Sequence, residues 1–294
     1  MLRASPGRSD CEARHPWQRS WLYHAPAQRG TMLWIFAVHL AALVGLIAAS
    51  RPSPALVLGA LALNLPGALG LTLGFHRSIA HRAVTFAPWL EQLLILCAMF
   101  NGSGSPRSWA SAHHLHHRYE DTLGDVSSPV VGGFWWAHLR WLWQMDRIPD
   151  DRIAVRLHAP RYARWEKWQP YILLVAVALP IYLGFTAWVW LAPVRLVYIL
   201  HAQCLVNSAA HMGARGAHGG TSKNLVWLAP IHYFLGENWH HSHHMNQASA
   251  RMGDRWWHID LAWQVVRALG ALGLATRIGH GRTHDGVTLL RHPP

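Results

Sequence analysis

Charged residues and cysteine are scarce in this chain. Only 14% of its 294 residues are charged, whereas 51% are hydrophobic, a balance that argues against an ordinary soluble domain. The three cysteines, Cys11, Cys97 and Cys204, are too few and too scattered for a disulfide framework or a thiolate cluster. The first 30 residues contain no apolar run after a short basic start, so we expect no cleavable signal peptide here.

The hydrophobic residues gather in runs of membrane-spanning length. Four runs, at about 31–50, 55–75, 171–191 and 194–212, reach the roughly 20 residues that a helix needs to cross a bilayer. Short turns at 51–54 and 192–193 separate the members of each pair. We therefore expect an all-α integral membrane protein with two helical hairpins, since a lipid-exposed backbone must satisfy its own hydrogen bonds.

Three further apolar segments, 89–100, 134–145 and 225–235, are too short to cross. Their length and their aromatic content predict interfacial or buried amphipathic helices. The mixed polar composition of residues 1–30 predicts a disordered or loosely held N-terminal tail, and residues 279–294 are expected to form a C-terminal tail.

The basic residues are distributed unevenly, and this predicts the topology. Of the 26 Lys and Arg residues, the first hairpin turn holds only Arg51 and the second hairpin only Arg195. The others lie in the N-terminal tail, between residues 77 and 167, and after residue 212. The positive-inside rule places these three regions, both termini included, in the cytoplasm of a multi-pass inner-membrane protein. The net charge of +12 then needs no nucleic acid to explain it.

Histidines recur at helical spacing. His240, His243 and His244 lie at i, i+3 and i+4 and share one helical face, and residues 113, 116 and 117 repeat that pattern. Three neutral imidazoles converging on one point make a metal site. His76 and His81 are five residues apart and point about 140° away from each other on a straight helix, so the chain must break for both to reach one site.

Asn207 and His211 form an i, i+4 pair near the end of the fourth apolar run, where polar side chains are costly unless they are functional. All these groups fall on the cytoplasmic side if segment 89–100 does not cross. Their histidines exceed what one tetrahedral ion binds, so two metals are expected. Imidazole suits iron, zinc and copper, and iron is favoured if the chemistry uses O₂.

Six stretches of the chain match the motifs of a known family. They are Gly74-Phe-His-Arg-Ser-Ile-Ala-His-Arg82, Trp109-Ala-Ser-Ala-His-His-Leu-His-His117, Gly133-Phe-Trp-Trp-Ala-His138, Asn207-Ser-Ala-Ala-His211, Gly236-Glu-Asn-Trp-His-His-Ser-His-His244 and Trp256-Trp-His-Ile-Asp260. In their order and spacing they resemble the integral-membrane fatty acyl desaturases of the stearoyl-CoA and bacterial or cyanobacterial Δ9 type. The resemblance covers about residues 32–278, and we treat 31–278 as one membrane domain.

The resemblance implies four transmembrane helices under a cytosolic helical cap that holds a di-iron centre. By position, the metal ligands would be His76, His81, His113, His116, His117, Asn207 (through a water), His211, His240, His243 and His244. Trp109 and Gln203 would lie on the wall of the substrate tunnel, where the animal enzymes have a hydroxyl residue at the position of Gln203.

The implied reaction uses O₂ and external electrons to remove two hydrogens from a fatty acyl chain on CoA, ACP or lipid, leaving a cis double bond at Δ9. The sequence contains no Cys-x-x-Cys-His haem motif and no Gly-x-Gly-x-x-Gly flavin motif. We therefore expect a separate electron donor, a ferredoxin or a cytochrome b5-like protein with its reductase, which the basic cytoplasmic face suits.

Two alternatives stay open at this point. A fatty acyl hydroxylase or acetylenase would use the same fold and ligands. A histidine-rich membrane metal-binding or transport protein would instead place ionisable residues through the middle of the membrane, whereas these ligand candidates gather at one face.

The other polar residues near the motifs have weaker assignments. His114 and His241 face away from their neighbours on a helix, so we do not count them as ligands. His39 and His201 are expected to pack between helices, and His138, His232 and His258 to support ligands or to lie at the interface. Four acidic residues are placed either to orient the imidazoles or to face solvent: Glu120, Asp121, Asp125 and Glu237.

Overall fold

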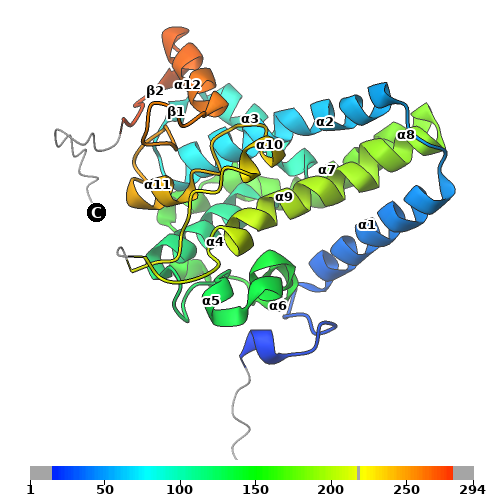
Figure 1. Ribbon diagram of the computed structural model, residues 1–294, viewed down its shortest axis with the longest axis horizontal. Coiled ribbons are helices and arrows are strands. Elements are labelled where there is room, and N and C mark those ends of the chain that lie inside the picture. Colours follow the sequence, from blue (N-terminus) through cyan, green and yellow to red (C-terminus); the bar gives the residue numbers. More distant parts are fainter. Residues whose placement is uncertain (1–14, 217–218, 281–294) are drawn as a thin grey trace, which may run out of the picture.

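The computed structural model describes residues 15–216 and 219–280, which fold mainly into helices (Figure 1). The longer helices are α1 Arg29–Ala48, α2 Pro54–Leu69, α3 Pro88–Phe100, α4 Pro106–Tyr119, α7 Pro160–Ala178, α9 Arg195–Ala209 and α12 Leu261–Ala271. The shorter elements are α5 Pro129–Gly132, α6 Trp141–Gln144, α8 Phe185–Val189, α10 Leu228–Ile231, α11 His240–Met245, and the strands β1 Thr85–Phe86 and β2 Ala275–Thr276. Turns of π-helix occupy Gly70–Ala80, Trp136–Arg140 and Trp190–Val194, and 3-10 turns occupy Pro16–Gln18, Asp150–Arg152, Val155–His158 and Leu179–Leu183.

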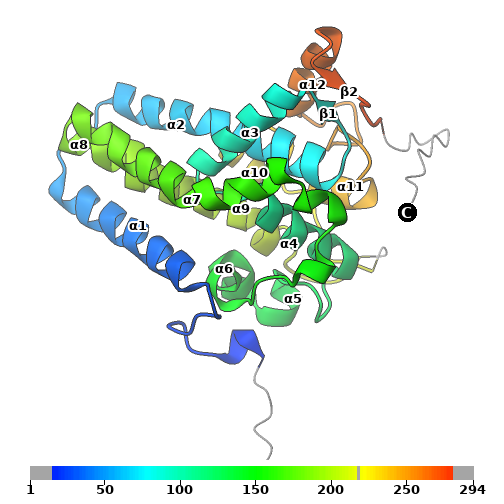
Figure 2. The same cartoon turned by 180° about the vertical axis from the view of Figure 1, so that it is seen from behind.

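Three helical stretches are long and apolar enough to cross a membrane, and they indicate membrane association: Arg29–Ala48, Pro54–Ala80 and Phe185–Ala209. They run side by side with α7. The α1–α2 turn and α8 lie at one end of this set, and α4 and α11 lie at the other (Figures 1 and 2). Leu40, Leu43 and Ile47 on α1 are exposed, as expected of a helix that faces lipid. The two predicted runs at 31–50 and 55–75 are thus helical.

The second hairpin turns at a different place from the one predicted. Gly184, at φ +93°, ends the 3-10 extension of α7, and the next helix runs unbroken from Phe185 to Ala209. The predicted bounds 171–191 and 194–212 are therefore wrong. Pro193 lies inside this helix, within the π-turn Trp190–Val194, and such local adjustments let a membrane helix accommodate the missing N–H of proline.

Helix α7 is not among the three stretches of spanning character. Its first turns carry Arg161, Arg164, Glu166 and Lys167, and only its later part, from Tyr171, is apolar. Four crossings therefore remain a proposal.

The short apolar segments behave differently from one another. Residues 88–100 form α3, which packs against α2 and its π-helical extension. Most of 134–145 is helical, as the π-turn followed by α6. The helix predicted over 225–235 is wrong, since only Leu228–Ile231 is helical and Tyr233 and Phe234 adopt φ of 55° and 56°.

The described part of the N-terminal tail is held in place rather than loose, which corrects that prediction. Gln144 Nε2 donates to the Ser20 carbonyl at 2.7 Å and Arg140 Nη2 to the Arg19 carbonyl at 2.6 Å. Ala25 N donates to the Trp143 carbonyl at 2.9 Å. Residues 1–14, and residues 281–294 of the predicted C-terminal tail, lie outside the described residues.

A buried ion pair fixes the segment that precedes α11. Arg77 Nη2 donates to Asp260 Oδ1 at 2.9 Å and to the Leu235 carbonyl at 2.7 Å. Gly236, at φ +96°, packs against this carboxylate so closely that a Cβ would lie 2.6 Å from Asp260 Cγ. The π-helical segment Gly70–Ala80, Leu235 just before Gly236, and Asp260 are thereby held together. Removal of either partner would leave an uncompensated buried charge, which costs about 3–5 kcal/mol.

Candidate metal centre

Nine histidines gather into two adjacent groups. The five-histidine group is His76, His81, His113, His117 and His243, and the four-histidine group is His116, His211, His240 and His244. Within each group the candidate ligand atoms all lie within 4.8 Å of one another. The rings of His117 and His244, one from each group, have centroids only 4.3 Å apart. The structure thus brings together all nine histidines singled out by the sequence.

A π-helix brings His76 and His81 to the same group. In Gly70–Ala80 the backbone bonds run from i to i+5, and His81 N donates to the His76 carbonyl at 3.1 Å. Five residues then make about one turn, so the two rings lie 5.1 Å apart. The predicted chain break is therefore wrong, because a widened helix achieves the same convergence.

Helices α4 and α11 each supply both groups. On α4, His113 and His117 belong to the five-histidine group and His116 to the other; on α11, His240 and His244 belong to the four-histidine group and His243 to the first. The expectation that each triad converges on one metal is wrong. An i, i+4 pair goes to one group, and the i+3 residue, which points to one side of that pair on the helix, goes to the other.

The end of α9 supplies the last member. His211 follows α9 directly and is fully buried, with its Nε2 2.7 Å from His240 Nε2. Asn207 lies one turn earlier on α9 and is partly buried. The structure places it at the right end of the helix, but its role as a ligand stays a prediction.

The imidazoles present the same nitrogen to one another. In the five-histidine group, His243 Nε2 lies 3.0 Å from the Nε2 atoms of both His76 and His117. His113 Nε2 lies 2.7 Å from that of His81 and 3.0 Å from that of His117. In the other group His244 Nε2 is 3.0 Å from His240 Nε2 and 3.2 Å from His116 Nε2.

Carboxylates stand behind several of these rings, on the Nδ1 side. Glu237 Oε2 lies 2.9 Å from His76 Nδ1, Asp125 Oδ2 lies 2.9 Å from His116 Nδ1, and Glu120 Oε2 lies 2.9 Å from His244 Nδ1. Asp121 Oδ1 is 3.6 Å from His211 Nδ1. The four acidic residues singled out in the sequence therefore face imidazoles rather than bulk solvent.

This arrangement fits bound metal ions. A carboxylate beside Nδ1 places the hydrogen on that nitrogen and leaves a lone pair on Nε2. His116 and His244 are both held in this way, yet their Nε2 atoms face each other at 3.2 Å. Two lone pairs at that distance repel unless a cation lies between them. At metal–nitrogen distances of about 2 Å, opposite ligands are about 4 Å apart, which agrees with the spread of each group.

Burial keeps most of these rings neutral, as ligands must be. It lowers the pKa well below the ordinary histidine value in His81, His113, His117, His240 and His243, and neighbouring imidazoles lower it further. Burial also lowers the pKa of His244 to about 3. In His116 burial acts in the same direction, but the adjacent Asp125 carboxylate outweighs it and the pKa is raised. The Glu237 carboxyl has a pKa of about 2, because His76 and Arg77 overcome the effect of its burial.

The two predicted tunnel residues lie in different surroundings. Trp109 stacks on His113, with ring centroids 4.8 Å apart and planes 21° from parallel, and contacts Phe75. It therefore forms an apolar wall of the five-histidine group. Gln203 Nε2 donates to Ser103 Oγ at 2.8 Å, which joins α9 to the loop between α3 and α4. Their contact with a substrate stays a prediction.

The remaining histidines lie outside both groups. His114 Nε2 faces the Ala80 carbonyl at 3.0 Å, and His241 Nδ1 lies 3.4 Å from Ser222 Oγ. His138 Nε2 contacts His201 Nδ1 at 2.8 Å, and His201 Nε2 contacts His39 Nε2 at 3.0 Å. This row ties α1, α9 and residues 136–140 together, whereas the sequence predicted packing for two of its members without showing that they meet.

Comparison with known proteins identifies the family. The family model for fatty acid desaturases matches residues 52–279. An sn-1 stearoyl-lipid 9-desaturase of Anabaena variabilis is 35% identical over 259 residues, which cover 84% of this chain and 92% of the relative. The chain belongs to the fatty acid desaturase family.

Other desaturases of this family are similarly close. A chloroplastic palmitoyl-monogalactosyldiacylglycerol delta-7 desaturase of Arabidopsis thaliana is 34% identical over 275 residues, covering 89% of this chain and 71% of the relative. An icosanoyl-CoA 5-desaturase of Limnanthes douglasii is 36% identical over 221 residues, covering 72% and 61%. Desaturases are oxidoreductases of fatty acyl chains, and the two histidine groups of this chain are arranged so that they could hold metal.

Proposed function

We propose that this protein is an O₂-dependent di-iron desaturase that introduces a cis double bond at position 9 of a saturated fatty acyl chain. The observation that carries the proposal is the pair of adjacent histidine groups at one end of the apolar helices. The names of the Anabaena variabilis and Synechocystis relatives, both sn-1 stearoyl-lipid 9-desaturases, support position 9. They also favour a lipid-borne chain over CoA or ACP as carrier.

In this proposal the five-histidine group holds one iron, and the four-histidine group holds the other, completed by Asn207 through a water. The chemistry that iron supplies there is the reductive activation of O₂, which zinc cannot provide because it has no redox chemistry. Overall, the acyl chain loses two hydrogens; these, with two external electrons and two protons, convert O₂ to two waters. A separate donor, a ferredoxin or a cytochrome b5-like protein with its reductase, provides the electrons.

The side chains of the protein prepare the site for this reaction. Glu120, Asp125 and Glu237 hold imidazoles with Nε2 pointing inward. Trp109 covers His113 with an apolar face, against which a methylene chain can lie, and Gln203 lies one turn before Asn207 on α9. Selection of one C–C bond then depends on position, since all methylenes of the chain are chemically alike.

The proposed topology has four crossings, with α7 as the third. If Phe185–Ala209 crosses toward the histidine groups, the chain must first reach its far end at Gly184. The segment Pro160–Leu183 directly precedes Gly184 and brings the chain to that far end. It must therefore cross the membrane in the opposite direction. The two outer turns, at residues 49–53 and at Gly184, carry a single charged residue, Arg51, as the positive-inside rule expects of turns outside the cytoplasm. A protease-accessible tag at residue 52 should therefore be cleaved from outside; cleavage only from the cytoplasmic side would refute this topology.

The activity is tested by expression in a host with a simple lipid profile, followed by mapping of double-bond positions by mass spectrometry. We expect new cis-9 monounsaturated chains, which appear in glycerolipids before they appear in thioesters. His243→Ala should abolish them while the protein still inserts into the membrane. Hydroxylated or acetylenic products would refute desaturation, and earlier labelling of thioesters would refute the lipid carrier.

A further inference from the structure

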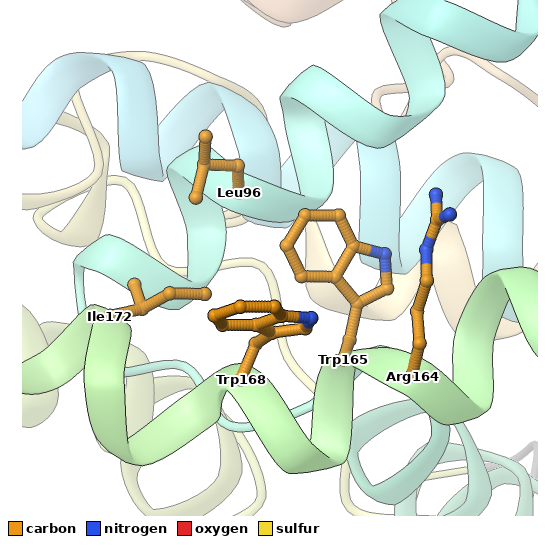
Figure 3. Close-up of a pocket in the computed structure, with 5 residues that line it drawn as sticks. All are labelled: Leu96, Arg164, Trp165, Trp168 and Ile172. Carbon is orange, nitrogen blue, oxygen red and sulfur yellow. The ribbon is translucent and has the colours of Figure 1, made fainter.

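A cavity of about 310 Å³ lies between α3 and α7, apart from the histidine groups. It is lined by Leu96 of α3 and by Arg164, Trp165, Trp168 and Ile172 of α7, whose side chains surround one space (Figure 3). A cavity of this size is at the lower limit for binding a small organic molecule. None of its lining residues belongs to the site described above.

The cavity opens on a surface of apolar side chains. Leu96 is 41% exposed and Trp168 57%. Exposed apolar residues continue from it along both helices, at Leu93 on α3 and at Tyr171 and Val175 on α7. In a protein with membrane-crossing helices such a surface faces lipid, and Trp and Tyr are the residues enriched at the membrane–water boundary.

A positive charge is held at the mouth of the cavity. Arg164 Nη2 donates to Gln92 Oε1 at 2.6 Å, and Trp165 Nε1 donates to the same oxygen at 2.9 Å. The guanidinium is therefore positioned by a neutral amide. Within the described residues no carboxylate forms an ion pair with Arg164, and those of Asp150 and Glu166 pair with Arg107, so the charge of Arg164 is left for an anion.

We propose that this cavity binds one anionic glycerophospholipid of the surrounding bilayer. Its phosphate would lie at Arg164, and the first part of one acyl chain along Leu96, Trp168 and Ile172. Arg164 and Ile172 are eight residues apart, or about 12 Å along the helix, which spans the step from headgroups to hydrocarbon. The inference rests on the proposed crossing of α7 but not on the desaturase reaction.

The test uses the purified full-length protein in nanodiscs with a trace of phosphatidylglycerol that carries a photoactivatable diazirine on its acyl chain. We expect labelling of peptides from α3 and α7 around Leu96 and Ile172, with phosphatidylcholine of the same chain labelling them less. Arg164→Gln should reduce the phosphatidylglycerol labelling about fivefold, as one basic residue near an anionic lipid contributes about a factor of five. Leu96→Trp, which fills the cavity, should remove it.

Matched controls lie one turn away. Arg161→Gln removes an exposed charge from the same helix, and Leu93→Trp adds the same bulk to α3 outside the cavity; neither should change the labelling. Equal labelling by both lipids, unaffected by Arg164→Gln, would show only annular contact and overturn the proposal. Absence of labelling would also overturn it. Because crosslinking needs no turnover, a failed desaturase assay would leave this result unaffected.

Discussion

The two histidine groups are adjacent, yet their surroundings differ. In the four-histidine group three rings have a carboxylate near Nδ1, from Asp125, Glu120 and Asp121. In the five-histidine group, among the described residues, only His76 has one, from Glu237. The four-histidine group thus has fewer imidazoles and more negative charge around them. The five-histidine group has more imidazoles and an apolar wall.

This difference indicates how each group would hold its metal. A carboxylate behind an imidazole fixes the ring and makes its free nitrogen a better electron-pair donor to a metal. Four rings oriented in this way can therefore bind a metal as tightly as five rings with less support. The five-histidine group has Trp109 stacked on His113 and Phe75 behind it. We infer that an acyl chain approaches the five-histidine group from its apolar side. The carboxylates surround the four-histidine group instead.

The largest effect is expected from removing a ligand. His240→Ala leaves three imidazoles in the four-histidine group, whereas His81→Ala leaves four in the other. Both should lower activity by at least about 100-fold, a larger loss than the 10–100-fold typical of supporting residues. Only His240→Ala should reduce the iron content from about two to about one per chain. Activity is measured by product formation and metal by elemental analysis of the purified protein.

His241→Ala is the matched control, because His241 neighbours His240 but belongs to neither group. It should keep both irons and most of the activity. Equal iron loss in His81→Ala and His240→Ala would break the comparison, since it would mean that the fifth imidazole adds no redundancy.

A smaller effect is expected from the carboxylates. Glu237→Gln removes the carboxylate behind His76 and should weaken metal binding in the five-histidine group by about 10–100-fold. Asp125→Asn should weaken the other group by only about tenfold, because Glu120 and Asp121 remain. Metal affinity is measured by competition with a chelator. Glu166→Gln, which alters an exposed pair with Arg107, should have no effect, and a larger loss in Asp125→Asn than in Glu237→Gln would contradict the assignment.

The sequence predicted most of the site, because its signals are local. The spacing of the histidines on α4 and α11 places them on one helical side, and long apolar runs predict α1 and α2 directly. Division of the nine histidines between two groups was not predictable in this way. It depends on where the end of α9 and the π-helical segment lie, and those positions come from packing between distant segments.

The π-helix shows why such features escape local patterns. Gly70 and Gly74 lie so close to α3 that added Cβ atoms would be 2.3 Å from the Leu94 carbonyl oxygen and 3.0 Å from Leu94 Cβ. This approach, between residues far apart in sequence, accompanies the widened helix. The turn at Gly184 did have a local signal. It is the only glycine between residues 133 and 213, whereas Pro193, where the apolar runs predict the turn, is a residue type that membrane helices tolerate.

The smallest effect concerns pH and the metal-free protein, and it separates His116, which has Asp125 beside it, from His117, which has no carboxylate partner among the described residues. His117 has a pKa lowered by burial, so the unfolded chain takes up this proton first, and the stability contributed above about pH 6.5 is lost as the pH falls. His116 has a raised pKa because Asp125 outweighs its burial, so its contribution is present below about pH 6.5 and is lost as the pH rises. Each amounts to at most about 1.4 kcal/mol per pH unit. Thermal unfolding in detergent should therefore show a flatter limb below about pH 6.5 in His117→Gln and a flatter limb above about pH 6.5 in His116→Gln. Changes in the same limb for both variants would mean that Asp125 does not set the charge of His116, and the contrast between an acid-supported group and an apolar one would lose its electrostatic basis.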